Sequence, residues 1–118
     1  MMRKLTAILL AGALLTACGM PQIHHTQLTA LDKGLAPPDV VARLKLEPSV
    51  IHNAQADGRT FEFYQYRMNN GMQTDQYLIV FEGAKLVYWG YLDELRKHPD
   101  KALAAAAGQV ASAVLAVR

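Results

Sequence analysis

Three tight-turn signals in the second half of the chain constrain its fold more than any other feature. They are Asp57-Gly58, Asn69-Asn70-Gly71 and Gly83, and Asp-Gly and Asn-Gly pairs supply the positive φ angles that tight hairpins require. The segments between these turns are rich in aromatic and β-branched residues, which favour strands. Regular hairpin spacing predicts an antiparallel meander. We expect a short strand over 50–52 and then three long strands over 59–68, 76–82 and 85–91.

Helical patterns flank the predicted meander on both sides. Leu28, Leu31 and Leu35 have helix-like spacing, and Pro37-Pro38-Asp39 can open a second helix because proline suits the first helical position. After the meander, eight alanines between residues 101 and 118 predict a helix over 100–117. The expected fold class is therefore α+β. Two short N-terminal helices would pack on one face of an antiparallel three- to four-stranded meander, with an added Ala-rich C-terminal helix.

The first 18 residues have the layout of a secretory signal. A basic start with Arg3 and Lys4 precedes an apolar run over 5–17, which is shorter than the roughly 20 residues that span a bilayer. Cys18, the only cysteine, directly follows a small residue, and this arrangement resembles the lipobox of bacterial lipoproteins. The resemblance implies that residues 1–17 are removed and that Cys18 becomes an S-diacylglycerol, N-palmitoyl cysteine. A lone core cysteine and an uncleaved membrane anchor are the alternatives.

These features give three expected parts. Residues 1–17 form the signal peptide, 18–27 a lipidated tether and 28–118 a single domain that includes the C-terminal helix. The chain has 12 Lys and Arg and 10 Asp and Glu residues, so losing Arg3 and Lys4 with the signal leaves a neutral protein. Without a basic run there is no footprint for nucleic acid and no polybasic patch for an anionic membrane. We expect membrane attachment through the lipid alone.

The titratable residues do not form a pattern typical of catalysis or metal binding. His24 and His25 are adjacent and therefore point apart in any regular element, and no cysteine or carboxylate accompanies them. Asp93 and Glu94 precede basic residues on a predicted helix, where solvated ion pairs are the usual outcome. We predict no enzyme activity, no metal, no cofactor and no small-molecule substrate.

The aromatic residues of the predicted strands alternate between two faces. Phe61 and Phe63 share one face, while Tyr64 and Tyr66 share the other, and Trp89 lies opposite Tyr88. If one face is the core, Tyr64, Tyr66 and Trp89 form a candidate partner-binding surface, because Tyr and Trp are enriched in interface cores. Alternatively, the C-terminal helix covers this second face. The predicted core residues are Phe61, Phe63, Val80 or Phe81, Leu86 or Val87, Val40 and Leu44.

The Ala-rich segment carries two different stripes. Its apolar stripe contains Leu103, Val110, Val114 and Val117, and its small stripe contains Ala104, Gly108, Ser112 and Ala116. We expect the apolar stripe to dock on the domain. The small stripe, with Gly108 and Ser112 at its centre, would then be available to a partner or a second copy, because small side chains let backbones approach closely. Alternatively, the alanines serve only as helix formers.

Several segments together resemble the SmpA/OmlA (BamE-like) family of small outer-membrane lipoproteins. They are Gly34-Leu35-Ala36-Pro37-Pro38-Asp39-Val40, Leu44 to Pro48, the aromatic run Phe61 to Tyr66 and the hairpin Leu78 to Leu86. The resemblance implies two short helices followed by a meander, and a non-enzymatic role on the periplasmic side of the outer membrane in the insertion of β-barrel proteins.

The expected function is therefore an envelope structural or outer-membrane assembly role through contacts with a protein partner in the cell envelope. The same fold also occurs in secreted inhibitors of β-lactamases, so the alternative is a lipoprotein that captures a specific enzyme through its sheet face. Gly19 rather than Asp follows Cys18. This resembles the outer-membrane sorting pattern and implies a lipid-anchored protein that faces the periplasm.

Overall fold

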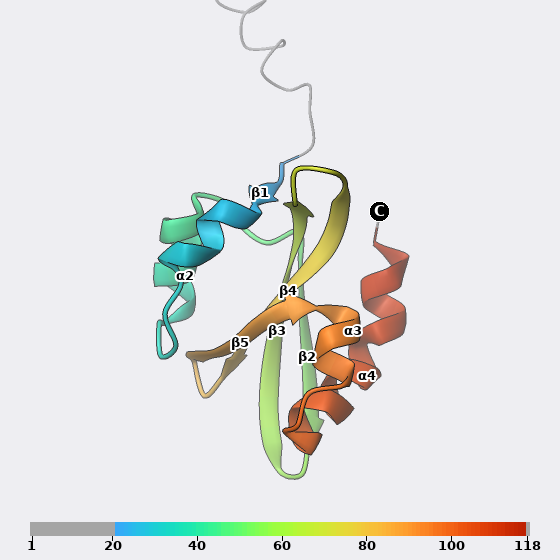
Figure 1. Ribbon diagram of the computed structural model, residues 1–118. Coiled ribbons are helices and arrows are strands. Elements are labelled where there is room, and N and C mark those ends of the chain that lie inside the picture. The colour runs from blue at the N-terminus through green and yellow to red at the C-terminus, as the bar shows by residue number, and fades with distance from the viewer. Residues whose placement is uncertain (1–20, 118) are drawn as a thin grey trace, which may run out of the picture.

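The computed structural model describes residues 21–117, so the predicted signal peptide and Cys18 lie outside the described residues. The described chain is α+β, as predicted, with a curled mixed sheet and helices on either side of it (Figure 1). The elements in order are β1 (Ile23–His24), the 3₁₀ helix η1 (His25–Ala30), α2 (Pro37–Leu44), β2 (Val50–Ala56), β3 (Arg59–Asn69), β4 (Thr74–Glu82), β5 (Lys85–Tyr91), α3 (Leu92–Arg96) and α4 (Lys101–Ala116).

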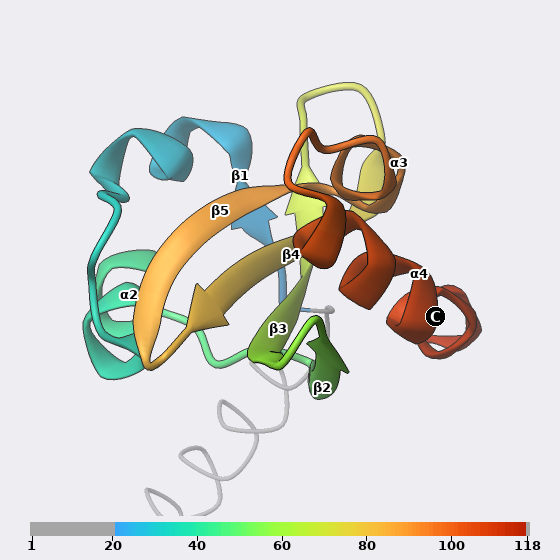
Figure 2. The ribbon, with the colours of Figure 1, turned by 90° about the horizontal axis from the view of Figure 1, so that it is seen from below.

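Strands β2 to β5 form the predicted antiparallel meander. Asp57 and Gly58 both have positive φ, at 55° and 72°, and close the β2–β3 hairpin as the sequence indicated. β2 is longer than the expected short strand and pairs with β3 from Val50 to Ala56. Val87 is an extra residue of β5 relative to β4. Such a bulge bends a strand, and Figure 2 shows β5 curling around the sheet.

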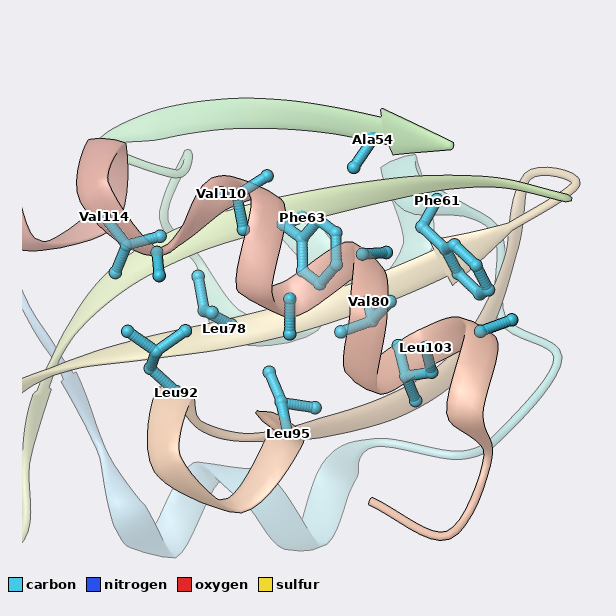
Figure 3. Close-up of a cluster of buried hydrophobic side chains, with 14 residues drawn as sticks. Ala54, Phe61, Phe63, Leu78, Val80, Leu92, Leu95, Leu103, Val110 and Val114 are labelled. Carbon is cyan, nitrogen blue, oxygen red and sulfur yellow. The ribbon is translucent and has the colours of Figure 1, made fainter. Parts of the chain in front are cut away.

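One face of the sheet is covered by α3 and α4 (Figure 2). Phe61 and Phe63 of β3 lie beneath α4, together with Leu78 and Val80 of β4 (Figure 3). The predicted apolar stripe is confirmed for three of its members, Leu103, Val110 and Val114, which are buried against this face. Val117 follows the helix as its C-cap residue. The alanines of α4 that face the sheet are small enough to let the helix lie close to the two phenylalanines.

The other face is covered by η1 and α2 and holds a separate core. Val40 and Leu44 of α2 pack there with Tyr66 and with Phe81 and Leu86. The two N-terminal helices therefore share one face, as expected, and α4 lies on the other face, so both faces of the sheet are covered. The expectation of a single core is wrong, because the sheet separates the predicted core residues into two clusters. The reason lies in β4, which is buried at every position from Tyr77 to Phe81 and so needs cover on both faces.

The folded region begins earlier than the expected end of the tether at residue 27. Ile23 is fully buried and pairs in parallel with Met68, so β1 extends the same side of β3 that β2 occupies further along. The side-chain amide of Gln27 donates a hydrogen bond to the Leu44 carbonyl over 3.0 Å. The burial of this single isoleucine beside β3 holds the segment in the domain. One apolar residue leaves no periodic pattern in the sequence, so the sequence did not predict this strand.

The two outer edges of the sheet differ. Near the start of β5, the Gly34 amide donates to the Leu86 carbonyl over 2.7 Å, and the Leu86 amide donates to the Leu35 carbonyl over 2.8 Å. The segment before α2 therefore closes the β5 edge at this point. β2, which is paired only with β3, forms the opposite edge.

Polar contacts fix α4 to the sheet. Arg59 of β3 donates to both Glu82 and Asp100, and the Asp100 carboxylate caps α4 by accepting from the amides of Ala102 and Leu103. Near the other end of the helix, the buried Gln65 side chain donates to the Val114 carbonyl over 3.1 Å. The helix is therefore anchored at both ends as well as packed along its length.

Candidate partner-binding surface

Tyr66 is a core residue rather than part of an exposed aromatic face. Its side chain is fully buried, and its hydroxyl donates to the Leu46 carbonyl over 2.9 Å. Burial raises the pKa of this phenol well above its usual value. The sequence assigned Tyr66 to the correct face, but α2 and the chain that follows it cover that end of the face.

The other predicted candidates lie apart from one another. Trp89 is half-buried and packs against the core beneath η1 and α2. Gly108 and Ser112 are exposed on α4, which covers the opposite face of the sheet from Tyr64. The structure therefore does not assemble the predicted residues into one site, and only Tyr64 borders an open part of the sheet face.

Tyr64 lies at the boundary between covered and open sheet. Its ring meets Phe81 edge to face, with centroids 4.8 Å apart. It also lines a groove of about 350 Å³ together with Pro37, Pro38 and Val41 of α2 and Glu47. Partial burial, with Glu62 and Glu47 nearby, raises the pKa of the Tyr64 hydroxyl, which keeps this group a neutral hydrogen-bond donor at physiological pH.

Beyond Tyr64 the sheet face is open as far as the β2–β3 hairpin. The cross-strand pairs on this side are Ile51 with Tyr64, Asn53 with Glu62 and Gln55 with Thr60. Ile51 is 46% exposed although it is a large apolar residue. A second hollow of about 280 Å³ lies between Asn53, Thr60 and Glu62 and the β4–β5 turn. We call Ile51, Asn53, Thr60, Glu62 and Tyr64, with Pro38 and Val41 beside them, the open sheet patch.

The open sheet patch has the composition of a protein-contact surface. Polar groups surround an exposed isoleucine, a tyrosine and the rigid prolines of α2. Protein–protein interfaces have the same arrangement, with an apolar centre and a polar rim. Sequence reasoning missed Ile51, because the candidate surface on the sheet was predicted from aromatic residues alone. In the described part of the chain, no group of three or more His, Cys, Asp or Glu residues is placed to bind a metal ion.

None of the helices within residues 21–117 has both the length and the apolar character that crossing a bilayer requires. Comparison with known proteins finds no matching family model, curated protein or solved structure.

Proposed function

We propose that the chain is a membrane-anchored, non-enzymatic lipoprotein of the cell envelope that binds a protein partner through the open sheet patch. The observation that carries this proposal is the exposure of Ile51 beside Tyr64 and the α2 groove. Lipid attachment at Cys18, residence at the outer membrane and an assembly role like that of the SmpA/OmlA family are parts of the same proposal. The order of short helices before a meander supports the resemblance.

The position of the N-terminal segment supports a defined orientation at the membrane. Only residues 19–22 separate Cys18 from the buried Ile23, so a lipid on Cys18 could be at most about 17 Å from β1. β1 lies at the same end of the molecule as the β3–β4 turn (Figure 1), where Met72 is 94% exposed. A lipid anchor would hold this end near the bilayer, while the open sheet patch extends toward the β2–β3 hairpin at the far end.

The assembly role can be tested by complementation of a deletion strain. Wild-type protein should restore resistance to detergents and large antibiotics, whereas Cys18→Ala, which cannot be lipidated, should not. Ile51→Glu should also fail, because it places a charge in the centre of the proposed contact. Leu115→Glu is the matched control, since Leu115 is an exposed apolar residue on α4. Normal permeability in the deletion strain would argue strongly against the assembly role.

Capture of a specific enzyme remains the second candidate, because the same patch could bind an enzyme surface. In this case the wild-type protein should retain one soluble enzyme from a periplasmic extract. Ile51→Glu should lose that enzyme, Leu115→Glu should retain it, and the deletion strain should have an intact permeability barrier. Recovery of an outer-membrane barrel complex instead would favour the assembly role.

A further inference from the structure

The β3–β4 turn carries the most exposed large apolar side chain within residues 21–117. Met72 is 94% exposed at the tip of this turn, and the turn lies at the end of the molecule where β1 joins the sheet (Figure 1). One exposed apolar side chain is ordinary by itself. The turn that carries this one, however, has three further properties of a segment that contacts a membrane.

The first property is that the turn satisfies its own backbone amides. The Asn70 amide donates to the Gln73 carbonyl over 3.2 Å. The Gly71 amide donates to the Asn69 side-chain oxygen over 2.8 Å. The side-chain oxygen of Asn70 accepts from the amides of Met72 and Gln73 over 3.0 and 2.9 Å. Every amide from residue 70 to residue 73 therefore has a partner other than water. Because an unpaired amide is unfavourable where water is scarce, this turn is suited to enter such a region.

The second property is the lack of charged side chains in the two segments that meet at this end. Residues 68–74 contain no Lys, Arg, Asp or Glu, and neither do residues 21–31. His25 of η1 lies beside the turn, with 3.4 Å between its Nδ1 and the Asn69 carbonyl oxygen. The nearest charged residues along β3 and β4 are Arg67 and Asp75, which have opposite signs. A charged group is strongly disfavoured close to the apolar part of a bilayer, and these two segments bring none there.

The third property is the short distance between the turn and the proposed lipid. Thr74, near the base of the turn, donates its hydroxyl to the side-chain oxygen of Gln22 over 3.4 Å. Only residues 19–21 separate Gln22 from Cys18, and this stretch of chain spans at most about 14 Å. Since the acyl chains of a lipid on Cys18 must enter the bilayer, the turn would be held at the membrane surface.

We propose that the β3–β4 turn is a second membrane contact, in which the Met72 side chain inserts among the lipids at the bilayer interface beside the acylated Cys18. This inference rests on the lipid attachment in the proposed function and adds the part of the fold that touches lipid. The contact would depend on apolar burial rather than on charge. A methionine side chain suits it, because its flexible thioether adapts to irregular surroundings.

A second contact would also restrict the orientation of the domain. A lipid anchor alone lets the domain rotate about the chain that follows Cys18, whereas an anchor and an inserted turn together remove most of that freedom. The open sheet patch, which extends toward the β2–β3 hairpin at the far end of the molecule, would then be directed away from the membrane.

The test measures whether position 72 lies within the bilayer. Full-length Met72→Cys protein is purified from bacterial membranes, labelled with a thiol-reactive fluorophore and reconstituted into phosphatidylcholine vesicles. A second set of vesicles contains phosphatidylcholine with a nitroxide quencher near the top of its acyl chain. The label at position 72 should lose most of its fluorescence in the second set, because the nitroxide quenches only at close range. Ile51→Cys is the matched control, since Ile51 is an exposed apolar residue on the open sheet patch, and its label should stay bright.

Two further measurements identify the cause of the quenching. Quenching at position 72 should persist at high salt and should not require anionic lipid, because no charged side chain takes part in the contact. Adding Asn70→Ala to Met72→Cys should reduce the quenching, because the amides at positions 72 and 73 then lose their acceptor.

The wild-type protein separates a failure of the anchor from a failure of the turn. Its only thiol is that of Cys18, so lipidated wild-type protein should take up no label even when denatured. Labelling of the wild type would show that Cys18 is free and would overturn the anchor together with this inference. An unlabelled wild type with an unquenched label at position 72 would leave the anchor standing and overturn the contact, and the turn would then be open to a protein surface. Equal quenching at positions 51 and 72, or its loss at high salt, would also overturn the contact.

Discussion

Among single residues, Gly34 shows most clearly how a local conformation serves the whole fold. Its φ of 93° lies in a region that residues with a side chain rarely adopt. This conformation lets the Gly34 amide and the Leu35 carbonyl meet the two backbone groups of Leu86, which closes the β5 edge. The glycine that begins the family-like segment therefore has a structural task in this chain.

Gly34→Ala should lower the free energy of unfolding by about 1–2 kcal/mol, because it forces an L-residue into positive φ. An added Cβ would meet no atom within 4 Å, so the effect arises from the backbone alone. Chemical denaturation measures it, and Ala36→Gly serves as a control at a residue with negative φ. An unchanged midpoint for Gly34→Ala would contradict the proposed need for glycine.

At the scale of elements, α4 depends on contacts that lie far away in the sequence. Arg59 joins β3, β4 and the N-terminus of α4, with N–O distances of 2.8 Å to Glu82 and 2.9 Å to Asp100. Hydrogen bonds from Arg59 lower the pKa of both carboxyl groups. Arg59 also lies over the Phe61 ring at 5.0 Å, a contact that does not depend on pH.

The Arg59 cluster predicts a pH-dependent stability difference. A carboxyl group whose pKa is lower in the folded state stabilises the fold at pH values above its unfolded-state pKa of about 4. This stabilisation is lost as the pH falls through the folded-state pKa. Arg59→Gln should therefore reduce the melting temperature most at neutral pH, and the difference should shrink as the pH falls from about 5 to about 2. Arg96→Gln, at an exposed position of α3, is the control. A difference that stays constant with pH would contradict the role of ionised carboxylates.

Gly108 gives a prediction of the opposite sign for α4. It lies in the middle of the helix, is exposed, and has no atom within 4 Å of an added Cβ. Gly108→Ala should raise the free energy of unfolding by about 1 kcal/mol through helix propensity. Ala106→Gly, at a fully buried position of the same helix, should instead destabilise the protein. Thermal denaturation compares the stability of these two variants with that of the wild type. A Gly108→Ala variant that is less stable than wild type would show that glycine is required at this position.

At the scale of the whole molecule, two hydrophobic cores share one sheet. Phe63 and Leu78 point to the face under α4, while Tyr66 and Ile79 point to the face under α2. Because alternate residues of β3 and β4 belong to different cores, neither core can form without the strands that the other core stabilises. We therefore expect the described domain to unfold as one cooperative unit.

Phe63→Ala and Ile79→Ala test this coupling from opposite faces. Phe63→Ala should lower the free energy of unfolding by about 3–5 kcal/mol and Ile79→Ala by about 2–5 kcal/mol. Either loss is a large share of a small domain's stability. Each variant should still unfold in a single transition, whether followed by Trp89 fluorescence or by circular dichroism. Leu115→Ala, at a residue 68% exposed, should have little effect. Two separate transitions in either core variant would show that the cores are independent.

The sequence alone determined those features that depend on neighbouring residues. Asp57-Gly58 set the β2–β3 hairpin through positive φ angles, the alternation along 59–68 set which residues share a face, and alanine content set the C-terminal helix. These follow from backbone geometry and intrinsic propensity, which act over a few residues.

Only the tertiary structure decided which faces are covered, because burial depends on elements distant in the chain. It placed helices on both faces, buried Tyr66 beneath the segment after α2, drew Ile23 into the sheet and left Ile51 exposed beside Tyr64. Strand alternation puts Tyr64 and Tyr66 on the same face and does not predict which of the two is buried. Their different environments arise because α2 is short and covers only one end of that face.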